Sequence, residues 1–301
     1  MPSPTPAQTS SRAATTAAVG SILLWCWSGV CFRMGAELMG DMAYLTGMTA
    51  VGSLTVIVLH AWGGKPIAPL LKLPPRVIFA GFWGVAFYTV ILSMAFGMAD
   101  PPDIGQINLL NYLWPIWLVL LSFFMLAEKA NPLRTLAGAL AGLAGVAIAR
   151  GPKELAVVPT NLLPHAMALA GGVMWSLYCV LLRRWRVPEE NGGTAFHFAV
   201  CAAMAALIAW WRGQWHALPP VSANMIFWIL FGGIGPVGLG YHWWEIGMKR
   251  GNVHLISLLA YFIPIGSSAL IGFFFRQALN PGLLIGAFLI AAGAWIAREK
   301  K

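Results

Sequence analysis

Long apolar runs that carry almost no charge follow one another from one end of this chain to the other. Each run is close to the ~20 residues that, at ~1.5 Å per residue, cross the hydrocarbon core of a bilayer as a helix. The chain is 59% hydrophobic and 10% charged, whereas about a quarter of the residues of a soluble domain are charged. Because backbone groups inside lipid must be hydrogen-bonded within their own segment, these runs predict an all-α membrane protein.

Ten such runs are present, and we expect ten transmembrane helices. They lie at 13–32, 42–62, 77–98, 104–126, 133–149, 162–182, 194–211, 225–247, 253–275 and 281–297. Residues 1–12 are mostly polar and proline-rich, and are predicted to be a disordered cytoplasmic tail. The connections are too short to hold a soluble domain, and no Gly-x-x-x-x-Gly-Lys-Ser/Thr loop occurs, which argues against an ATP-driven pump.

The Lys and Arg residues are divided unevenly between the two sides of the predicted bundle. With the N-terminus in the cytoplasm, 14 of them fall on the cytoplasmic side and 5 on the other. Basic residues favour cytoplasmic loops, so both termini are predicted inside, in a multi-pass protein of the cell inner membrane. The basic residues do not form a patch with interleaved aromatics, so no nucleic acid is expected as a partner.

The chain also contains a tandem repeat. Residues 107–140 align without a gap to residues 149 positions later, which pairs Tyr112 with Tyr261 and Pro115 with Pro264. The two halves, 13–150 and 160–298, hold five spans each, so the second half enters the membrane from the opposite side. The expected architecture is two inverted five-helix repeats with a substrate site near the midplane of the bilayer.

The segment from Asn111 to Pro115 lies near the middle of an apolar run. Asn108, Asn111, Tyr112 and Pro115 share one helix face because they are three, four and seven residues apart. Polar side chains at this depth usually face a bundle interior or a water-filled cavity. Proline leaves a backbone carbonyl without its helical partner, so Pro115 and Pro264 are predicted to be paired hinges.

Several motifs carry a resemblance to a known family. They are Trp27-Ser28, Tyr88, Asn111-Tyr112-Leu113-Trp114-Pro115, Trp175 with Tyr178-Cys179, Tyr241 with Trp244, Gly251-Asn252-Val253, and Tyr261-Phe262 with Pro264. The chain resembles the drug/metabolite transporter superfamily, in its EamA-type branch of ten-helix exporters, and most closely the bacterial aromatic amino acid exporters. The resemblance implies export of aromatic and other neutral amino acids through a central cavity by alternating access. Glu245 departs from the family pattern, in which a neutral amide is expected.

Aromatic and amide side chains inside the spans are the candidate substrate-binding residues. They are Trp27, Tyr88, Asn108, Asn111, Tyr112, Trp175, Tyr178, Tyr241, Trp244 and Tyr261. A deep Tyr or Trp offers a ring face together with one hydrogen-bonding group, and the amides suit the amino and carboxylate groups of a zwitterion. The alternative is structural: the rings pack between helices, and the amides form interhelical hydrogen bonds.

Glu245 is the one carboxylate within a predicted span, with His242 and Lys249 on the same helix. One interpretation is that Glu245 and His242 couple transport to protons. The other is an interfacial Glu–Lys pair four residues apart at a helix end.

Other functions find little support in the sequence. It contains no paired intramembrane carboxylates, no His-Glu-x-x-His and no Gly-x-Ser-x-Gly, so an enzyme is not expected. The four cysteines lie in apolar runs and suggest neither disulfides nor zinc, and no cofactor or metal is expected. Efflux of aromatic cations remains an alternative to amino acid export. The expected partners are the bilayer and a small substrate, in a monomer or weak dimer whose Gly138-x-x-x-Gly142 and Gly282-x-x-x-Gly286 allow close helix packing.

Overall fold

The computed structural model describes residues 6–98, 107, 110–126, 131–151, 161–187, 193–276 and 282–296. These residues form helices and short connections, and no strand occurs among them. The helices are α1 (Pro6–Cys26), α2 (Ser28–Met39), α3 (Asp41–Trp62), α4 (Ala68–Leu71), α5 (Pro75–Gly81), η1 (Phe82–Phe87), α6 (Tyr88–Met98), α8 (Trp114–Met125), α9 (Pro132–Arg150), α11 (Leu163–Arg184), α12 (Thr194–Trp211), α13 (Ala223–Gly232), η4 (Gly233–Leu239), α14 (Gly240–Arg250), α15 (Val253–Leu259), α16 (Phe262–Phe274) and α17 (Gly282–Ile296).

Seven helical stretches are long and apolar enough to cross a membrane, which confirms the all-α membrane class. They are Arg12–Met39, Asp41–Trp62, Pro75–Met98, Leu163–Arg184, Thr194–Trp211, Ala223–Arg250 and Val253–Phe274. Two shorter apolar helices, Trp114–Met125 and Leu133–Ile148, are also present among the described residues.

The first span is longer than predicted at both ends. Helix α1 begins at Pro6, within the segment expected to be a disordered tail, and α2 continues to Met39. The predicted span ended at residue 32 because the next residue, Arg33, is charged. In the structure Arg33 Nε lies 3.0 Å from Glu37 Oε1, one helical turn further on, and such pairs support an exposed helix.

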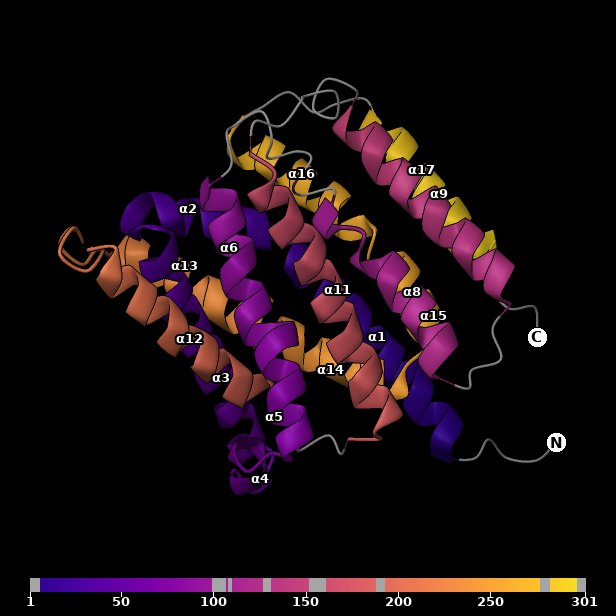
Figure 1. Ribbon diagram of the computed structural model, residues 1–301, viewed down its shortest axis with the longest axis horizontal. Coiled ribbons are helices and arrows are strands. Elements are labelled where there is room, and N and C mark those ends of the chain that lie inside the picture. Colours follow the sequence, from indigo (N-terminus) through magenta and orange to yellow (C-terminus); the bar gives the residue numbers. More distant parts are fainter. Residues whose placement is uncertain are drawn as a thin grey trace.

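Helices α9 and α17 form a pair at one side of the bundle (Figure 1). A Cβ built on Gly145 would lie 2.6 Å from the carbonyl oxygen of Gly286, and one on Gly293 would lie 2.6 Å from that of Gly138. The backbones therefore touch, as glycine allows in membrane helix pairs. Because the later residue of one helix meets the earlier residue of the other, the two helices run antiparallel.

Two helix breaks overlap at one aligned pair of the predicted repeat, Tyr112 and Tyr261. Tyr112 and Leu113 form a turn just before α8, and Ala260 and Tyr261 form a turn between α15 and α16. Pro115 then lies in the first turn of α8, where the missing N–H of proline costs no helical hydrogen bond.

Two π-helical segments, η1 and η4, interrupt the spans Pro75–Met98 and Ala223–Arg250. These spans are the third and the eighth in the predicted order, so the segments also fall at corresponding positions. A π-helical turn widens the backbone ladder, and such turns are frequent at functional sites. Pro236 lies inside η4.

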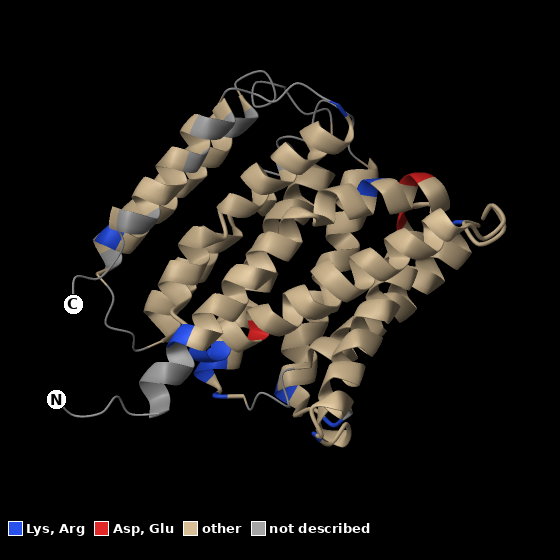
Figure 2. Ribbon diagram, turned by 180° about the vertical axis from the view of Figure 1, so that it is seen from behind, with Lys and Arg blue, Asp and Glu red and all other residues tan. Residues whose placement is uncertain are grey.

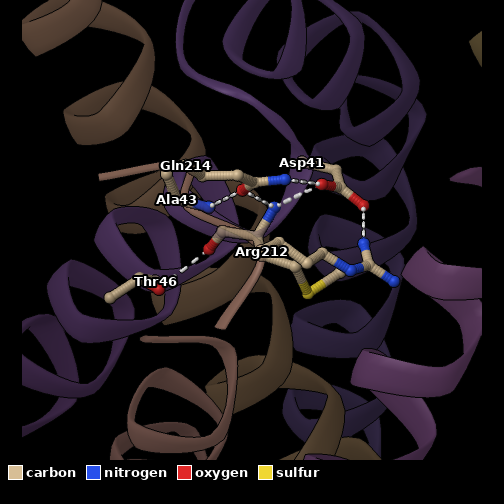
Figure 3. A network of polar contacts seen from close by, with 6 residues as sticks. Asp41, Ala43, Thr46, Arg212 and Gln214 are labelled. Atoms are coloured by element: carbon tan, nitrogen blue, oxygen red, sulfur yellow. Dashed lines mark hydrogen bonds and ion pairs between the residues drawn. The ribbon is translucent and has the colours of Figure 1, made fainter. Parts of the chain in front are cut away.

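A polar network fixes the start of α3 (Figure 3). The side-chain oxygen of Gln214 accepts hydrogen bonds from the backbone N–H groups of Met42 and Ala43, and its amide nitrogen donates to Asp41. Arg212 lies 3.2 Å from the same carboxylate. Since the first N–H groups of a helix have no partner within it, Gln214 caps α3 from the connection that follows α12.

Candidate functional site

A cluster of aromatic rings surrounds Trp175, near the middle of α11. Trp175 is only 4% exposed, and five rings from three other helices and its own lie around it. The ring centroids lie at 6.1 Å for Trp25, 6.0 Å for Tyr88, 6.0 Å for Tyr178, 5.3 Å for Tyr241 and 6.3 Å for Trp244. The structure thus brings together five of the predicted binding residues, namely Tyr88, Trp175, Tyr178, Tyr241 and Trp244.

Hydrogen bonds orient three rings of this cluster. The indole N–H of Trp25 donates to the carbonyl of Pro236 in η4 at 2.9 Å. The indole N–H of Trp244 donates to Cys179 Sγ at 3.3 Å, and the hydroxyl of Tyr88 donates to Asn111 Oδ1 at 3.3 Å. Each ring is therefore held at its polar end, while its faces remain in apolar surroundings.

Glycines make room for the same rings. A Cβ on Gly171 would lie 2.7 Å from Tyr88 Cδ2, and one on Gly84 would lie 2.3 Å from Tyr178 Cβ. A Cβ on Gly240 would lie 2.8 Å from the indole nitrogen of Trp25. Side chains at these three positions would push the rings apart, so the glycines fix how closely the helices approach around Trp175.

A small cavity adjoins the cluster. It is lined by Val85, Trp175, Tyr178, Cys179, Leu182, Thr194, Phe198, Tyr241, Trp244, Glu245 and Met248. Its free space is about that of one water molecule. Five of its eleven lining side chains are aromatic, and Glu245 is the single carboxylate among them.

Glu245 supplies that carboxylate from α14. Lys249 Nζ lies 2.5 Å from Glu245 Oε1, and the hydroxyl of Thr194 donates to Oε2. The side chains of Glu245 and Lys249 are 9% and 5% exposed. The predicted pair therefore forms, but it is buried at the cavity wall and is not a solvated pair at the interface. His242, on the same helix, is half-buried and is not among the lining residues.

Two other predicted residues, Trp27 and Tyr261, pack away from Trp175. Trp27 packs edge-on against Phe231 and Phe274, with centroids at 5.4 and 5.6 Å. Tyr261 is buried in a separate apolar cluster that includes Leu258 and Ile290. Tyr112 is half-buried at the helix break, and Asn108 falls outside the described residues.

The surroundings of Tyr261 explain its separation from Trp175. A Cβ on Gly142 of α9 would lie 2.4 Å from Tyr261 Cδ2, so this ring fills the space that the glycine leaves. Its hydroxyl has no hydrogen-bond partner among the described residues. The structure thus places Tyr261 in this separate cluster, whereas Tyr112 packs against the main core of the bundle.

Several residues of the site were not among the binding residues predicted from the sequence. Trp25 contacts Trp175, whereas the sequence favoured Trp27 of the same span, which lies about 200° further around the helix axis. Thr194 and Phe198 line the cavity from the first turns of α12. Neither has a signal of its own in the sequence, because a threonine or a phenylalanine near a span end is common.

The chain is similar in sequence to known transporters. Residues 162–298 match the EamA-like transporter family. The chain is 32% identical to the aromatic amino acid exporter YddG of Ancylobacter novellus over 285 residues, which covers 93% of this chain and 95% of that protein. It is 27% identical to the protein of the same name from Salmonella typhimurium, with 97% and 99% covered.

A protein of known crystal structure has the same fold. It superposes with a TM-score of 0.80 at 30% sequence identity, covering 94% of this chain and 96% of that one. The likeness in sequence and in fold extends over nearly the whole length of both molecules. The chain therefore belongs to the EamA-like transporter family of the drug/metabolite transporter superfamily.

Proposed function

We propose that this chain exports aromatic and other neutral amino acids across the bacterial inner membrane. The observation that carries the proposal is the cluster around Trp175, four of whose rings line a small cavity inside the bundle. Flat ring faces suit an aromatic side chain. The names of the Ancylobacter and Salmonella relatives support the same substrate class.

The proposed architecture is ten helices in two inverted halves, 13–150 and 160–298. Equivalent elements pack in equivalent ways: α1 lies on α14 as α11 lies on α6, and α3 lies on η4 as α12 lies on η1. The aligned helix breaks, the two π-helical segments and the antiparallel pair α9 and α17 support the same relation. An odd number of spans in each half would give this inversion.

Transport is proposed to occur by alternating access. The cavity has room for about one water molecule, so the helices must separate before an amino acid can enter. Basic residues at the end of α11 hold neighbouring helices at one end of the bundle. Arg183 donates to the carbonyls of Met248 and Gly251 at 3.1 and 2.9 Å, and Arg184 donates to that of Met125 at 2.7 Å. Opening toward this end would break these bonds.

A counterflow experiment tests the function. Proteoliposomes loaded with unlabelled phenylalanine should accumulate labelled phenylalanine, and tyrosine, tryptophan and threonine should compete. Uptake should saturate with concentration, whereas flux through a channel would not. Vesicles that show no saturable exchange of any of the four amino acids, with well-folded protein present, would rule the proposal out.

Efflux of aromatic cations is a second candidate, and the position of Glu245 favours it. A carboxylate among aromatic rings is an environment that binds organic cations. Lys249 already neutralises this carboxylate, which weighs against it. In the same assay an aromatic cation, and none of the amino acids, should compete if this candidate is correct.

A further inference from the structure

We infer that the Glu245–Lys249 pair receives the charged end of the substrate, with Glu245 taking the α-ammonium group and Lys249 the α-carboxylate. The inference rests on the proposed function and states where the two charges of an amino acid bind. The aromatic part of the cavity would then hold the side chain. The predicted ligand is a zwitterion, in preference to an amine or an acid of the same size.

The position of the pair is the first step of the argument. Glu245 lies in the cavity wall beside Trp175, Tyr241 and Trp244. Lys249 Nζ touches the cavity-facing carboxylate at 2.5 Å, and both side chains are at least nine-tenths buried. The cavity wall therefore carries one carboxylate, with the ammonium group of Lys249 directly behind it, and the remainder of the wall is mostly apolar.

The burial of the pair is the second step. Taking two charges out of water costs more than their attraction commonly returns, so a buried ion pair is weak evidence for a role in stability. The chain offers a comparison in Arg33 and Glu37, which have the same spacing of four residues on a helix, with the two charges in the opposite order. Their side chains are 46% and 58% exposed, as expected for a solvated pair on a helix surface.

The exchange of partners is the third step. When the pair opens around a zwitterion, Glu245 gains an ammonium group and Lys249 gains a carboxylate, so no buried charge is left without a partner. An amine would satisfy Glu245 and take from Lys249 its carboxylate neighbour, and an acid would take from Glu245 its ammonium neighbour. Separating buried opposite charges in this way is costly, so the pair would select against both classes.

Titration calorimetry on the purified full chain tests the inference with three ligands of one ring: phenylalanine, phenethylamine and phenylpropionate. Wild-type protein should bind phenylalanine at least about tenfold more tightly than either analogue. Lys249→Met should shift the preference at least about tenfold toward phenethylamine, and Glu245→Gln should shift it similarly toward phenylpropionate. Lys249→Arg, which keeps the charge, should retain the wild-type order.

Two further variants keep the test decisive if a single variant fails to fold. Glu245→Gln combined with Lys249→Met leaves no buried charge, and it should remove most of the advantage of phenylalanine over both analogues. The matched control, Arg33→Met with Glu37→Gln, should leave all three affinities unchanged. If the double variant at the cavity keeps the wild-type order of the three ligands, the inference is wrong and amino acid export still stands. If wild-type protein binds no amino acid, the proposed function fails and the inference fails with it.

Discussion

Trp175 shows how much a single side chain can organise in this molecule. Its indole contacts Trp25 of α1, Tyr88 of α6, Tyr178 of its own helix, and Tyr241 and Trp244 of α14. A ring that large buries much apolar surface and also fixes the angles of its neighbours. The same side chain is therefore expected to affect both substrate affinity and helix packing.

Replacing Trp175 by Phe should weaken the binding of aromatic amino acids more than that of threonine. The change shortens the ring face at the cavity, and stacking of this kind contributes ~0.5–1.5 kcal/mol, or roughly 2- to 13-fold in affinity. Competition constants in the counterflow assay would measure it. Trp62→Phe is the control, because Trp62 is 86% exposed. Equal losses for threonine and phenylalanine would show that Trp175 acts only on the fold.

Gln214 is expected to contribute more to stability than the ion pair beside it. Gln214→Ala removes a cap from two N–H groups of α3 as well as a hydrogen bond to Asp41, and loss of such a cap costs about 1 kcal/mol or more. Arg212→Met removes a partly exposed ion pair, which contributes about 0–1 kcal/mol. Thermal unfolding in detergent should show the larger drop for Gln214→Ala. A larger effect from Arg212→Met would contradict the capping role.

At the scale of helices, the places where a helix is interrupted indicate where the molecule can bend. Two turns, at Tyr112–Leu113 and Ala260–Tyr261, precede the helices that contain Pro115 and Pro264. Two π-helical segments interrupt the spans that carry Tyr88 and Tyr241 to the cluster. Interrupted helices tolerate bending where regular ones resist it, so movement should concentrate at these four places.

Replacing Pro115 or Pro264 by Ala should slow exchange more than it weakens binding. Alanine restores a backbone N–H, which lets the helix close across the turn and stiffens it. Exchange rates in proteoliposomes and affinities by calorimetry would be compared at equal expression. Pro75→Ala is a control, because Pro75 begins α5 after an ordinary connection. Unchanged exchange rates in both single variants would refute the hinge role.

On the scale of the whole molecule, the basic residues are divided unevenly between the two ends of the helix bundle. Most of the described Lys and Arg residues lie at the end of the bundle where α1 begins and α17 ends (Figure 2). Arg183 and Arg184 tie helix ends together at that side. The distribution agrees with the orientation expected from the sequence, in which this end faces the cytoplasm.

Cysteine labelling tests the orientation. Arg186 is exposed after α11, so Arg186→Cys in a protein without its four native cysteines should stay unlabelled by an impermeant maleimide in intact cells. Val221, exposed on the connection before α13, should react as Val221→Cys in the same background. Labelling at position 186 in unbroken cells, with position 221 protected, would reverse the predicted topology.

The sequence by itself determined the features that depend on neighbouring residues. The apolar runs established the helical membrane class, because lipid leaves the backbone no other partner than its own helix. The aligned Tyr-x-x-Pro motifs marked two places where helices break, because proline acts on the turn that contains it. Five rings of the cluster around Trp175 could be predicted as binding residues, because the depth of an aromatic residue within a span can be read from the sequence.

The tertiary structure decided which of these residues meet. Trp25 faces Trp175 and Trp27 does not, because residues two apart on a helix point in nearly opposite directions, and only packing selects the inner face. Tyr261 is taken into a gap left by Gly142 of another helix, and Lys249 is buried against a cavity wall completed by α11 and α12. Burial is a property of the surrounding helices, and these contacts join residues far apart in the chain, so no local pattern could reveal them.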